Sequence, residues 1–381
     1  MKSAFIIDIS GKVLNYDYSL VNSLQKKLGG DVILAAHIQD RTKYKGNRIR
    51  LLNLVPWKYK DSNHKLKRIA KAIEGLFNYI VLLLHILIKR PAILHFQWLP
   101  FMEFCSIDNY YVALIKRVRP KQKIVMTVHN VFPHEMSPKG RKKFKNRFLK
   151  VDKYIDHYIV HVNSTKSEIM KEFGITLPRI SVIPHGIFVP NYIPRKDYSA
   201  NGRHIIAYGY NSPYKGTDVL LDALQLMPEV DKKTMRLTIV GKMSENYYLQ
   251  LLTKAKGLNV NIIPTYIPDE QLYEMIDKVD YIALPYRKIS QSGVLLLALY
   301  FKKLLLVSNL PSFVETLEGF TDDMFFEANN AESLKNLIVR HIHKKINIEK
   351  QLEAISKLNK RYSWDESAKQ TFLVYEQVCT N

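Results

Sequence analysis

Two loops in the third quarter of this 381-residue chain carry the residues best suited to chemistry. One spans residues 208–216 and contains two glycines and Lys215; the other spans residues 290–296 and contains a Ser-Gly pair. Each follows an apolar run and precedes a helical pattern, which is typical of a strand, a tight turn and the start of a helix. Such a turn presents free backbone N–H groups and the positive end of a helix dipole to an anion. With the ammonium of Lys215 added, the pattern predicts a site for the diphosphate of a nucleotide.

Short apolar runs rich in β-branched residues alternate with helical patterns along the chain. The predicted strands cover residues 4–9, 32–37, 93–96, 124–129, 158–161, 180–183, 204–208, 236–240, 260–263, 281–284 and 304–307. Helical patterns lie between most of them, for example at residues 19–28, 219–226 and 269–278. This alternation and the chain length predict an α/β fold of two Rossmann-like domains, with parallel sheets that face each other across a cleft. Ligands bind beyond the carboxyl ends of such strands, so we expect the active site in that cleft.

Four segments, in chain order, resemble a known family, the retaining GT-B glycosyltransferases of family 4 type. Residues 182–186 resemble its Val-Ile-Pro-Asn-Gly segment, and residues 209–216 resemble its Gly-x5-Lys-Gly signature. Residues 291–308 are similar to its phosphate loop, the following helix and the next strand, and residues 363–375 to its closing helix. The resemblance covers nearly the whole chain, more weakly before residue 120. It implies GT-B architecture and transfer of a sugar from a nucleotide donor.

The chain departs from this family on the donor side. The family carries Arg beside the first glycine, where this chain has Tyr210. Alignment on Ala298 places Leu297 where the second Glu of the family's Glu-x7-Glu pattern, a ribose ligand, would stand. The first Glu, near Ile289 or Ser290, is also missing. We interpret the chain as a divergent subgroup whose donor contacts rely on the loop lysine and backbone amides; the alternative is an impaired donor site.

The resemblance implies a donor site assembled from several loops. Its expected members are Gly209, Tyr210, Lys215, Gly216, Tyr266, Gln291, Ser292, Gly293, Val294 and Glu315. Lys215 and the helix that begins near Ser292 would stabilise the departing diphosphate. Lys215 is therefore assigned a catalytic role, with an ordinary turn lysine as the alternative. The chain lacks the Asp-x-Asp motif of metal-dependent transferases, so we expect no metal and no other cofactor.

In the first domain, the strand at residues 124–129 ends in His129, which resembles the family histidine at the cleft. It is assigned a catalytic role, with a satisfied histidine at a strand end as the alternative. The candidate acceptor-binding residues are Gly11, Asn15, Trp98, Asn130 and His134. Trp98 would stack on a sugar ring or, equally well, belong to the core.

The predicted domain organisation follows from the resemblance and from a Pro/Asn-containing stretch near residue 190. We expect an acceptor- and membrane-side domain at residues 1–190 and a linker at residues 191–202. A nucleotide-sugar donor domain follows at residues 203–360, and a helix at residues 361–381 returns to the first domain. Two cysteines far apart match no metal or redox spacing.

Positive charge is concentrated in the first half of the chain. Residues 1–190 hold 33 Lys and Arg against 13 Asp and Glu, whereas residues 191–381 hold 24 against 22. Nucleic acid and an anionic membrane surface are the partners that such charge favours. The sequence shows no signature of a known nucleic-acid module. We therefore expect an anionic membrane surface and no nucleic acid.

Two segments are candidates for the membrane contact. Residues 65–73 form a basic amphipathic start, followed by mostly apolar residues 76–88, which are too few to span a bilayer at about 20 residues per span. We expect residues 76–88 to be a buried helix on the first sheet, and the basic start to lie on anionic headgroups. The basic stretch 141–150, with Phe144 and Phe148 one turn apart, is the second candidate or a solvated helix face.

We therefore expect a metal-independent retaining glycosyltransferase of hexosyltransferase type, acting in polysaccharide biosynthesis. It would move a sugar from a UDP- or GDP-linked donor to a glycan or lipid-linked glycan acceptor. No signal peptide is visible at the start of the sequence, so we expect a cytoplasmic protein that is peripheral on the inner face of the membrane. The main alternative is a non-catalytic nucleotide- or glycan-binding protein of the same fold, and a sugar-nucleotide epimerase or phosphorylase is another.

Overall fold

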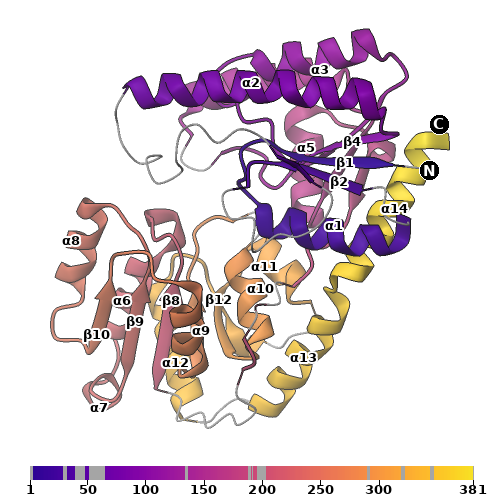
Figure 1. Cartoon of the computed structure of the whole chain (residues 1–381). Helices are drawn as coiled ribbons and strands as arrows, with labels where there is room; N and C mark the ends of the chain where they lie inside the picture. The colour runs from indigo at the N-terminus through magenta and orange to yellow at the C-terminus, as the bar shows by residue number, and fades with distance from the viewer. Residues whose placement is uncertain are drawn as a thin grey trace. The chain divides into compact units, whose positions relative to one another are not determined.

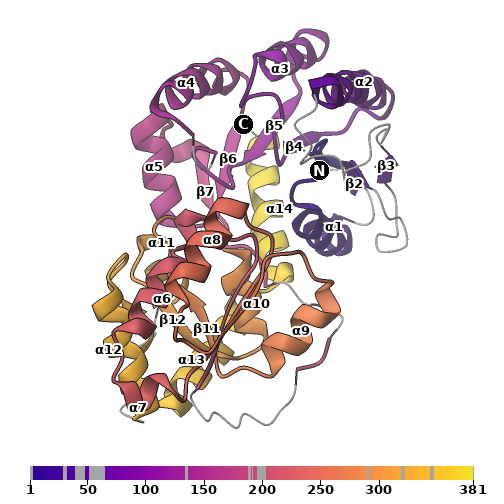
Figure 2. The same cartoon turned by 90° about the vertical axis from the view of Figure 1, so that its left-hand side faces the viewer.

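A computed structural model of the chain describes residues 3–28, 32–38, 48–50, 65–133, 136–187, 190, 192–194, 203–289, 292–318, 322–343 and 347–380. The chain divides into two compact units. Unit 1 consists of Met1–Gly186 with Ser363–Asn381, and unit 2 consists of Ile187–Tyr362. Each unit is a parallel sheet with helices on both faces (Figures 1 and 2). The predicted fold class, α/β with two Rossmann-like domains, is confirmed.

In unit 1 the described strands form one parallel sheet in the order β3-β2-β1-β4-β5-β6-β7. The strands are β1 (Ala4–Asp8), β2 (Val32–Ala36), β3 (Arg48–Arg50), β4 (Ile93–Phe96), β5 (Lys123–Thr127), β6 (His157–Val160) and β7 (Ile180–Val182). The helices are α1 (Leu14–Leu28), α2 (Lys65–Lys89), α3 (Ile107–Val118), α4 (Pro138–Asp152), α5 (Asn163–Phe173) and α14 (Trp364–Thr380). Helices α1 and α14 cover one face of the sheet, and α2 to α5 cover the other.

The central strands of unit 1 are apolar because both faces of the sheet are covered. All five residues of β1 are buried: Phe5 and Ile7 pack in the core under α2 to α5, and Ala4 and Ile6 pack under α1 and α14. Strands buried on both faces read as continuous apolar runs rather than as alternating ones. This explains why the strands could be predicted from short apolar segments.

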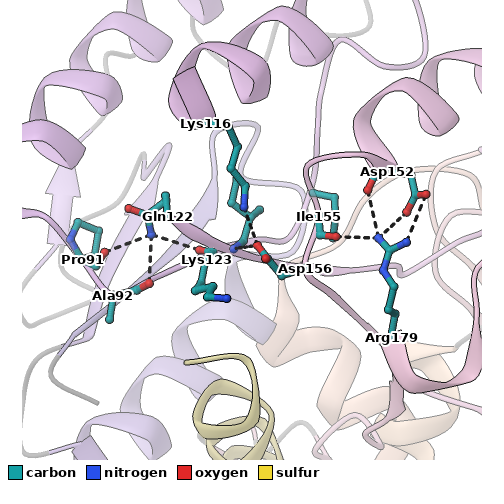
Figure 3. Close-up of polar contacts among 10 residues, drawn as sticks. Pro91, Ala92, Lys116, Gln122, Lys123, Asp152, Ile155, Asp156 and Arg179 are labelled. Carbon is teal, nitrogen blue, oxygen red and sulfur yellow. Dashed lines mark hydrogen bonds and ion pairs between the residues drawn. The ribbon is translucent and has the colours of Figure 1, made fainter. Parts of the chain in front are cut away.

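Polar contacts fix the amino ends of the strands of unit 1 (Figure 3). The side-chain amide of Gln122, just before β5, donates to the carbonyl oxygens of Pro91 and Ala92 at 3.2 and 3.1 Å, just before β4. Asp156, just before β6, accepts from the backbone N–H of Ile124 at 2.8 Å and from Lys116 at 2.9 Å. These groups are used for structure, which leaves the opposite edge, at the carboxyl ends, for function.

In unit 2 the described strands form one parallel sheet in the order β10-β9-β8-β11-β12-β13. The strands are β8 (His204–Tyr208), β9 (Arg236–Val240), β10 (Val260–Ile263), β11 (Tyr281–Leu284), β12 (Leu304–Ser308) and β13 (Phe325–Phe326). The helices are α6 (Thr217–Gln225), α7 (Glu229–Lys232), α8 (Glu245–Lys254), α9 (Asp269–Asp277), α10 (Gly293–Tyr300), α11 (Pro311–Thr316), α12 (Ala331–Ile342) and α13 (Ile348–Arg361). Helices α6, α8 and α12 pack on one face, and α9, α10, α11 and α13 pack on the other.

Every predicted strand is present within two residues of its predicted limits. The prediction misses β3 and β13, edge strands of three and two residues. It also starts the first helix too late: α1 begins at Leu14, five residues before the predicted start. The carboxylate of Asp8 accepts the backbone N–H of Val13 at 3.0 Å, which satisfies a donor at the start of this helix.

Helix α2 corrects the expectation of a buried helix at residues 76–88. Tyr79, Leu82 and Ile86 are buried, but Phe77 and Ile80 on the opposite face are exposed. The expectation is therefore correct for one face only. Within α2, the 21-residue stretch Ile69–Lys89 is long and apolar enough to cross a membrane by length and composition, and 28% of its 18-residue apolar segment is buried. The apolar segment is thus longer than the sequence analysis assumed.

Candidate functional site

Each sheet has a strand at which the order of strand addition changes direction, so that later strands are added on its other side. In unit 2, β8 lies between β9 and β11, and in unit 1, β1 lies between β2 and β4. The loops that leave two such strands diverge, and ligands of open α/β sheets bind beyond the carboxyl ends of the strands at this point. The loop after β8 carries Gly209 and Lys215, and the loop after β1 carries Gly11. Three predicted site residues, Gly209, Lys215 and Gly11, therefore lie where this topology places ligands.

Lys215 lies against the turn that follows β8. Lys215 is only 7% exposed. A Cβ on Gly209 would lie 2.9 Å from Lys215 Nζ and 3.4 Å from a methyl group of Val294. The ammonium lies 5.2 Å from the ring centroid of Tyr286. Burial lowers the pKa of Lys215, an effect that the neighbouring Tyr214 opposes. Three predicted donor residues, Gly209, Lys215 and Val294, are thus brought together around a buried ammonium.

Two glycines allow neighbouring loops of unit 2 to approach each other closely. Gly216 has a φ of 64°, and a Cβ there would lie 1.9 Å from the carbonyl oxygen of Pro285, just after β11. Gly241, just after β9, has a φ of 131°, and a Cβ there would lie 2.0 Å from the carbonyl oxygen of Gly209. Only glycine fits both positions. Gly216 belongs to the predicted site, whereas Gly241 does not, and together they fix the loops after β8, β9 and β11 against one another.

A polar clamp around Asn211 holds the loop after β8. The backbone N–H of Asn211 donates to the carbonyl oxygen of Lys242 at 2.9 Å, and its side-chain amide donates to that of Gly209 at 3.0 Å. The hydroxyl of Thr217 donates to Asn211 Oδ1 at 3.0 Å. The sequence analysis did not identify this clamp, because nothing in the spacing marks an asparagine in a turn as a structural anchor.

Arg287 ties the loop after β11 to the same turn. Its guanidinium donates to both carboxylate oxygens of Asp218, at 2.8 and 2.7 Å, and to the carbonyl oxygen of Pro213 at 2.5 Å. Its backbone N–H donates to the carbonyl oxygen of Tyr214 at 2.7 Å. Burial raises the pKa of Asp218, but the hydrogen bonds and charge of Arg287 outweigh it, so the pKa is lowered. This bidentate ion pair fixes the turn that carries Lys215, and the sequence analysis did not identify Arg287 or Asp218.

Helix α10 begins where the phosphate loop is expected. Ser292 is its N-cap, and its hydroxyl oxygen accepts the backbone N–H of Leu295 at 3.2 Å. Gly293 is exposed and Val294 is half-buried, and the Tyr208 hydroxyl donates to the Val294 carbonyl at 2.9 Å. The predicted residue Gln291 lies outside the described residues. The first turn of α10 therefore adjoins the Gly209 turn at the same edge of the sheet.

The other predicted donor residues have diverse surroundings. Tyr210 is 59% exposed, next to Gly209. Tyr266 is also mostly exposed, and its hydroxyl donates to Asp269, at the start of α9, at 3.4 Å. Glu315 is half-buried on α11. Leu297, in the place of the family's glutamate, is half-buried against the apolar core of unit 2.

In unit 1, Gly11 forms the turn after β1. It has a φ of 61°, and a Cβ there would lie 2.8 Å from the carbonyl oxygen of His37, just after β2. Its N–H donates to the carbonyl oxygen of Asp8 at 3.1 Å, and the Asp8 carboxylate accepts the Ser10 hydroxyl at 2.8 Å. A buried carboxylate thus holds the turn, and glycine allows the loops after β1 and β2 to approach.

His129 lies among aromatic rings just after β5. Its ring centroid is 5.0 Å from that of Tyr16 and 5.1 Å from that of His161. Its Nε2 lies 3.0 Å from Oε1 of Gln97, and its Nδ1 lies 3.3 Å from Nε2 of His161. The predicted catalytic histidine is therefore fixed on both ring nitrogens by residues that the sequence analysis did not select.

Four buried histidines at this edge of unit 1 are held in the neutral form. Burial, followed by the charges of neighbouring imidazoles, lowers the pKa of His129 well below its ordinary value. Burial also lowers the pKa of His161 to about 4 and those of His95 and His185 to about 3. At neutral pH this edge of unit 1 therefore contains uncharged rings, which do not attract a phosphate.

Trp98, after β4, is half-buried and stacks on His129, with centroids 5.5 Å apart and planes 15° apart. The ammonium of Lys12 lies 4.6 Å from its ring centroid. Asn15 is exposed in the first turn of α1, and Asn130 is half-buried beside His129. Trp98 and His129 are thus brought together, whereas His134 lies outside the described residues.

The described residues contain no group of three or more His, Cys, Asp or Glu side chains arranged to hold a metal ion.

Models of glycosyltransferase families match both halves of the chain. A model described as "Glycosyltransferase Family 4" matches residues 15–189, and one described as "Glycosyl transferases group 1" matches residues 192–363. A curated relative from Xanthomonas campestris pv. campestris, a GDP-mannose:glycolipid 4-beta-D-mannosyltransferase, is 23% identical over 223 residues. That alignment covers 56% of this chain and 60% of the relative's length.

Solved structures share the fold over the full length of the chain. A glycosyltransferase from Rickettsia africae ESF-5 superposes with a TM-score of 0.72 at 18% identity, covering 100% of this chain and 99% of that one. Anabaena Alr3699/HepE in complex with UDP and glucose gives a TM-score of 0.71 at 13% identity, covering 99% and 100%. At these identities the likeness shows the fold, and the family models add the family. The chain is therefore a glycosyltransferase that belongs to the GT-B enzymes of family 4 type.

Proposed function

We propose that this glycosyltransferase moves a sugar from a UDP- or GDP-linked donor to a lipid-linked glycan, with retention of configuration and without a divalent metal. The observation that carries the proposal is the buried ammonium of Lys215 beside Gly209. Among the described residues, no carboxylate forms an ion pair with it. A buried charge is costly unless a counter-charge accompanies it. The diphosphate of a nucleotide supplies that counter-charge, at the place where the topology puts a ligand.

Two groups of unit 2 would act on the departing diphosphate. As the bond between the anomeric carbon and the diphosphate oxygen breaks, negative charge develops on that oxygen. The ammonium of Lys215 and the N–H groups of the first turn of α10 would stabilise this charge. The contacts of Asn211 and Arg287 fix the turn that carries Lys215, and Ser292 caps α10. This electrostatic stabilisation is the role that a metal ion has in metal-dependent transferases, which supports the proposal of metal independence.

The identity of the donor is a choice between two nucleotide classes. The Anabaena structure is a complex with UDP, and the name of the Xanthomonas relative specifies GDP-mannose. Tyr266 and the loop around it are the candidate surroundings of the base. UDP- and GDP-sugars are therefore the first donors to test.

Unit 1 is the candidate side for the acceptor. Its site combines uncharged imidazole rings, the exposed part of Trp98 and the turn at Gly11, and such uncharged surroundings fit a glycan better than a phosphate. The Xanthomonas relative is named as acting on a glycolipid, and 33 Lys and Arg against 13 Asp and Glu in residues 1–190 favour an anionic membrane surface. These observations support a lipid-linked acceptor in polysaccharide biosynthesis and a peripheral position on the cytoplasmic face of the membrane.

Retention of configuration rests on the family resemblance. In a front-face reaction the acceptor oxygen forms its bond to the anomeric carbon on the side that the diphosphate leaves, and the acceptor proton passes to the departing phosphate oxygen. The name of the Xanthomonas relative specifies a β-linked product. The anomeric configuration of the product, read by proton NMR, is therefore a necessary measurement: retention is expected, and an inverted product would contradict this part of the proposal.

The proposal is tested by donor turnover in the presence of EDTA. The enzyme is incubated with a panel of UDP- and GDP-sugars, with and without lipid-linked glycan, and free nucleoside diphosphate is measured. We expect slow release without acceptor, faster release with it, and loss of both in Lys215→Ala. Lys278→Ala, an exposed lysine at the end of α9, is the matched control and should behave as the wild type. Turnover that requires added metal, or that survives in Lys215→Ala, would overturn the proposal.

A further inference from the structure

Helix α2 departs from the polarity expected for a surface helix, because its outward face is apolar as well as its inward face. Glu74 and Asn78 are buried under it, at 2% and 1% exposure, whereas Phe77 and Ile80 on the opposite side are 48% and 57% exposed. A surface helix of a globular protein normally turns its apolar stripe to the core and its polar residues to water. The outward face of α2 therefore has a purpose other than contact with water.

The exposed apolar residues of α2 form one continuous stripe. Its members are at least 38% exposed; they are Ile69, Ile73, Leu76, Phe77, Ile80, Leu84, Leu87 and Ile88. They recur at intervals of three and four residues, so they lie on a single side of the helix. At about 1.5 Å per residue the stripe is roughly 30 Å long. An exposed apolar surface of this extent marks an interaction site.

Helix α3 widens the exposed apolar surface. It lies beside α2 on the same face of the sheet (Figures 1 and 2), and the rings of Tyr79 and Tyr111 stack between the two helices with centroids 3.9 Å apart. Tyr110, Leu114 and Val118 of α3 recur at four-residue intervals and are exposed. The two helices together therefore present apolar side chains on the outside of unit 1.

The charge around this surface is positive. Residues 65–121 contain ten Lys and Arg and three Asp and Glu. All three carboxylates are occupied: Glu74 pairs with Lys71 at 3.1 Å, Glu103 pairs with Lys12 at 2.9 Å, and Asp108 accepts the hydroxyl of a buried tyrosine.

Exposed cations lie where the two helices end. They are Lys89, Arg90, Arg117 and Lys121. An apolar stripe flanked by cations is complementary to a lipid surface with anionic headgroups. Two copies of this face would instead bring like charges together, which disfavours a symmetric dimer.

The second candidate segment of unit 1 lacks such a stripe. Phe144 and Phe148 of α4 are buried at 8% and 2% exposure, and Phe148 stacks on Phe173 with centroids 4.0 Å apart. The exposed side of α4 is basic and carries Leu149 as its exposed large apolar residue. It can attract headgroups but has little to insert among acyl chains.

We propose that the α2 stripe, with the adjoining face of α3, is the surface by which the enzyme docks on an anionic lipid bilayer. Helix α2 lies in the plane of the interface, with Phe77, Ile80 and Leu84 among the acyl chains. The opposite side of α2 remains packed in the core of unit 1 through Leu82 and Ile86. This inference deepens the proposed function, since it rests on a membrane-bound acceptor, and it assigns the membrane contact to α2 rather than to α4.

Vesicle flotation without donor or acceptor tests the docking surface. Wild-type protein should float with vesicles of phosphatidylcholine containing about one-third phosphatidylglycerol, and bind pure phosphatidylcholine more weakly. The double variant Phe77→Glu, Ile80→Glu should lose at least about tenfold in binding, since it places charge among acyl chains. Val230→Glu, at an 80% exposed apolar residue of unit 2, is the matched control and should bind as the wild type. In the variant Ile80→Trp, brominated acyl chains should quench the fluorescence of the new tryptophan. In Val230→Trp, the fluorescence of the new tryptophan should not be quenched.

The possible outcomes separate docking from catalysis. The matched test on α4 is the double variant Lys142→Glu, Lys143→Glu. Unchanged flotation of the stripe variant would overturn the proposal, and so would loss of flotation in the α4 variant but not in the stripe variant. So would a wild-type dimer that fails to bind vesicles and becomes monomeric in the stripe variant, because a second copy would then cover the face. Release of nucleoside diphosphate without acceptor should be unaffected in the stripe variant. If the wild type lacks this turnover but still floats, the proposed function fails and the docking surface stands.

Discussion

The carboxyl edges of the two sheets share a topology but differ in chemistry. In unit 2 the loops after β8 and β11 contain glycine turns, a helix N-terminus and the buried ammonium of Lys215. In unit 1 the loops after β4 and β5 contain Trp98 and His129, and the imidazoles there are neutral. Under the proposed function, the carboxyl edge of the sheet would receive an anion in unit 2 and an uncharged, hydroxyl-rich ligand in unit 1.

The net charges of the two halves would suggest the opposite assignment. Residues 1–190 carry the large excess of positive charge, and residues 191–381 are nearly neutral. In unit 1 the cations lie on helices such as α4, whose basic side chains face outward, while the site is made of buried neutral rings. Net charge therefore reports what the surface of a unit attracts, and the site has to be read from individual buried groups.

The largest effect should come from Gly216→Ala in unit 2. Its Cβ would lie 1.9 Å from the backbone oxygen of Pro285, and its φ of 64° disfavours a side chain by about 1–2 kcal/mol. With the backbone shift added, we expect a loss of at least about 3 kcal/mol in unfolding free energy and no nucleotide binding. Urea unfolding followed by far-UV circular dichroism measures this. Gly257 has a φ of 77° and open space around it, so Gly257→Ala should lower the unfolding free energy only by the φ term of about 1–2 kcal/mol. An equal loss of unfolding free energy in both variants would contradict the close approach of Gly216 to Pro285.

Lys215→Met should separate binding from stability. Burial lowers the pKa of Lys215, so the fold of unit 2 disfavours the charged form, and removal of the charge should raise Tm. Nucleoside diphosphate affinity should fall by roughly 10- to 100-fold, the usual effect of a lost hydrogen bond to a charged group. Calorimetric melting with and without ligand measures both quantities. A lowered Tm with unchanged affinity would show that this lysine serves the fold.

Acid should destabilise unit 1 before unit 2. Five histidines of unit 1 have a lowered pKa, against two of unit 2; they are His95, His129, His157, His161 and His185 in unit 1, and His204 and His341 in unit 2. A histidine whose pKa is lower in the folded state binds fewer protons than in the unfolded state. Its contribution is therefore complete above about pH 6.5 and is lost as the pH falls toward 4.

Tryptophan fluorescence makes this pH prediction measurable. All three tryptophans belong to the residue ranges of unit 1. Their emission should change at a higher pH than the far-UV circular dichroism signal, to which both units contribute. Coincident transitions, or a fluorescence change at the lower pH, would show that the buried imidazoles do not set the acid stability of unit 1.

The smallest effect should come from Tyr210→Arg, which introduces the arginine that the family carries. Tyr210 is 59% exposed beside Gly209, so the new charge would be partly screened. We expect nucleoside diphosphate to bind about two- to fivefold more tightly, an effect of the size of an exposed ion pair. Leu249→Arg, an exposed position of α8, adds the same charge elsewhere and should leave affinity unchanged. Weaker binding in Tyr210→Arg would mean that the tyrosine itself contacts the donor.

The fold could be predicted because the strands buried on both faces are short apolar runs. The edge strands β3 and β13 were missed, since three and two residues are too few to show a period. The sequence analysis also placed residues 76–88 in the core. Composition alone did not show that the apolar stripe of α2 faces away from the core.

The candidate site could be predicted where it depends on neighbours in sequence. Gly209, Lys215 and Ser292 follow from strand, turn and helix signals. The pair formed by Arg287 and Asp218 joins residues 69 positions apart, and no local pattern connects them. Contacts of this kind become visible only when the sheet brings its loops together.

The most direct test of the central claim is titration calorimetry of UDP and GDP in EDTA, with wild-type protein and Lys215→Ala. The account predicts that at least one of the two nucleotides binds the wild type without metal, and that the variant loses roughly 10- to 100-fold in affinity. Equal affinity for both proteins would contradict the placement of the diphosphate at Lys215. Binding that appears only when a divalent metal is added would contradict the metal-independent site.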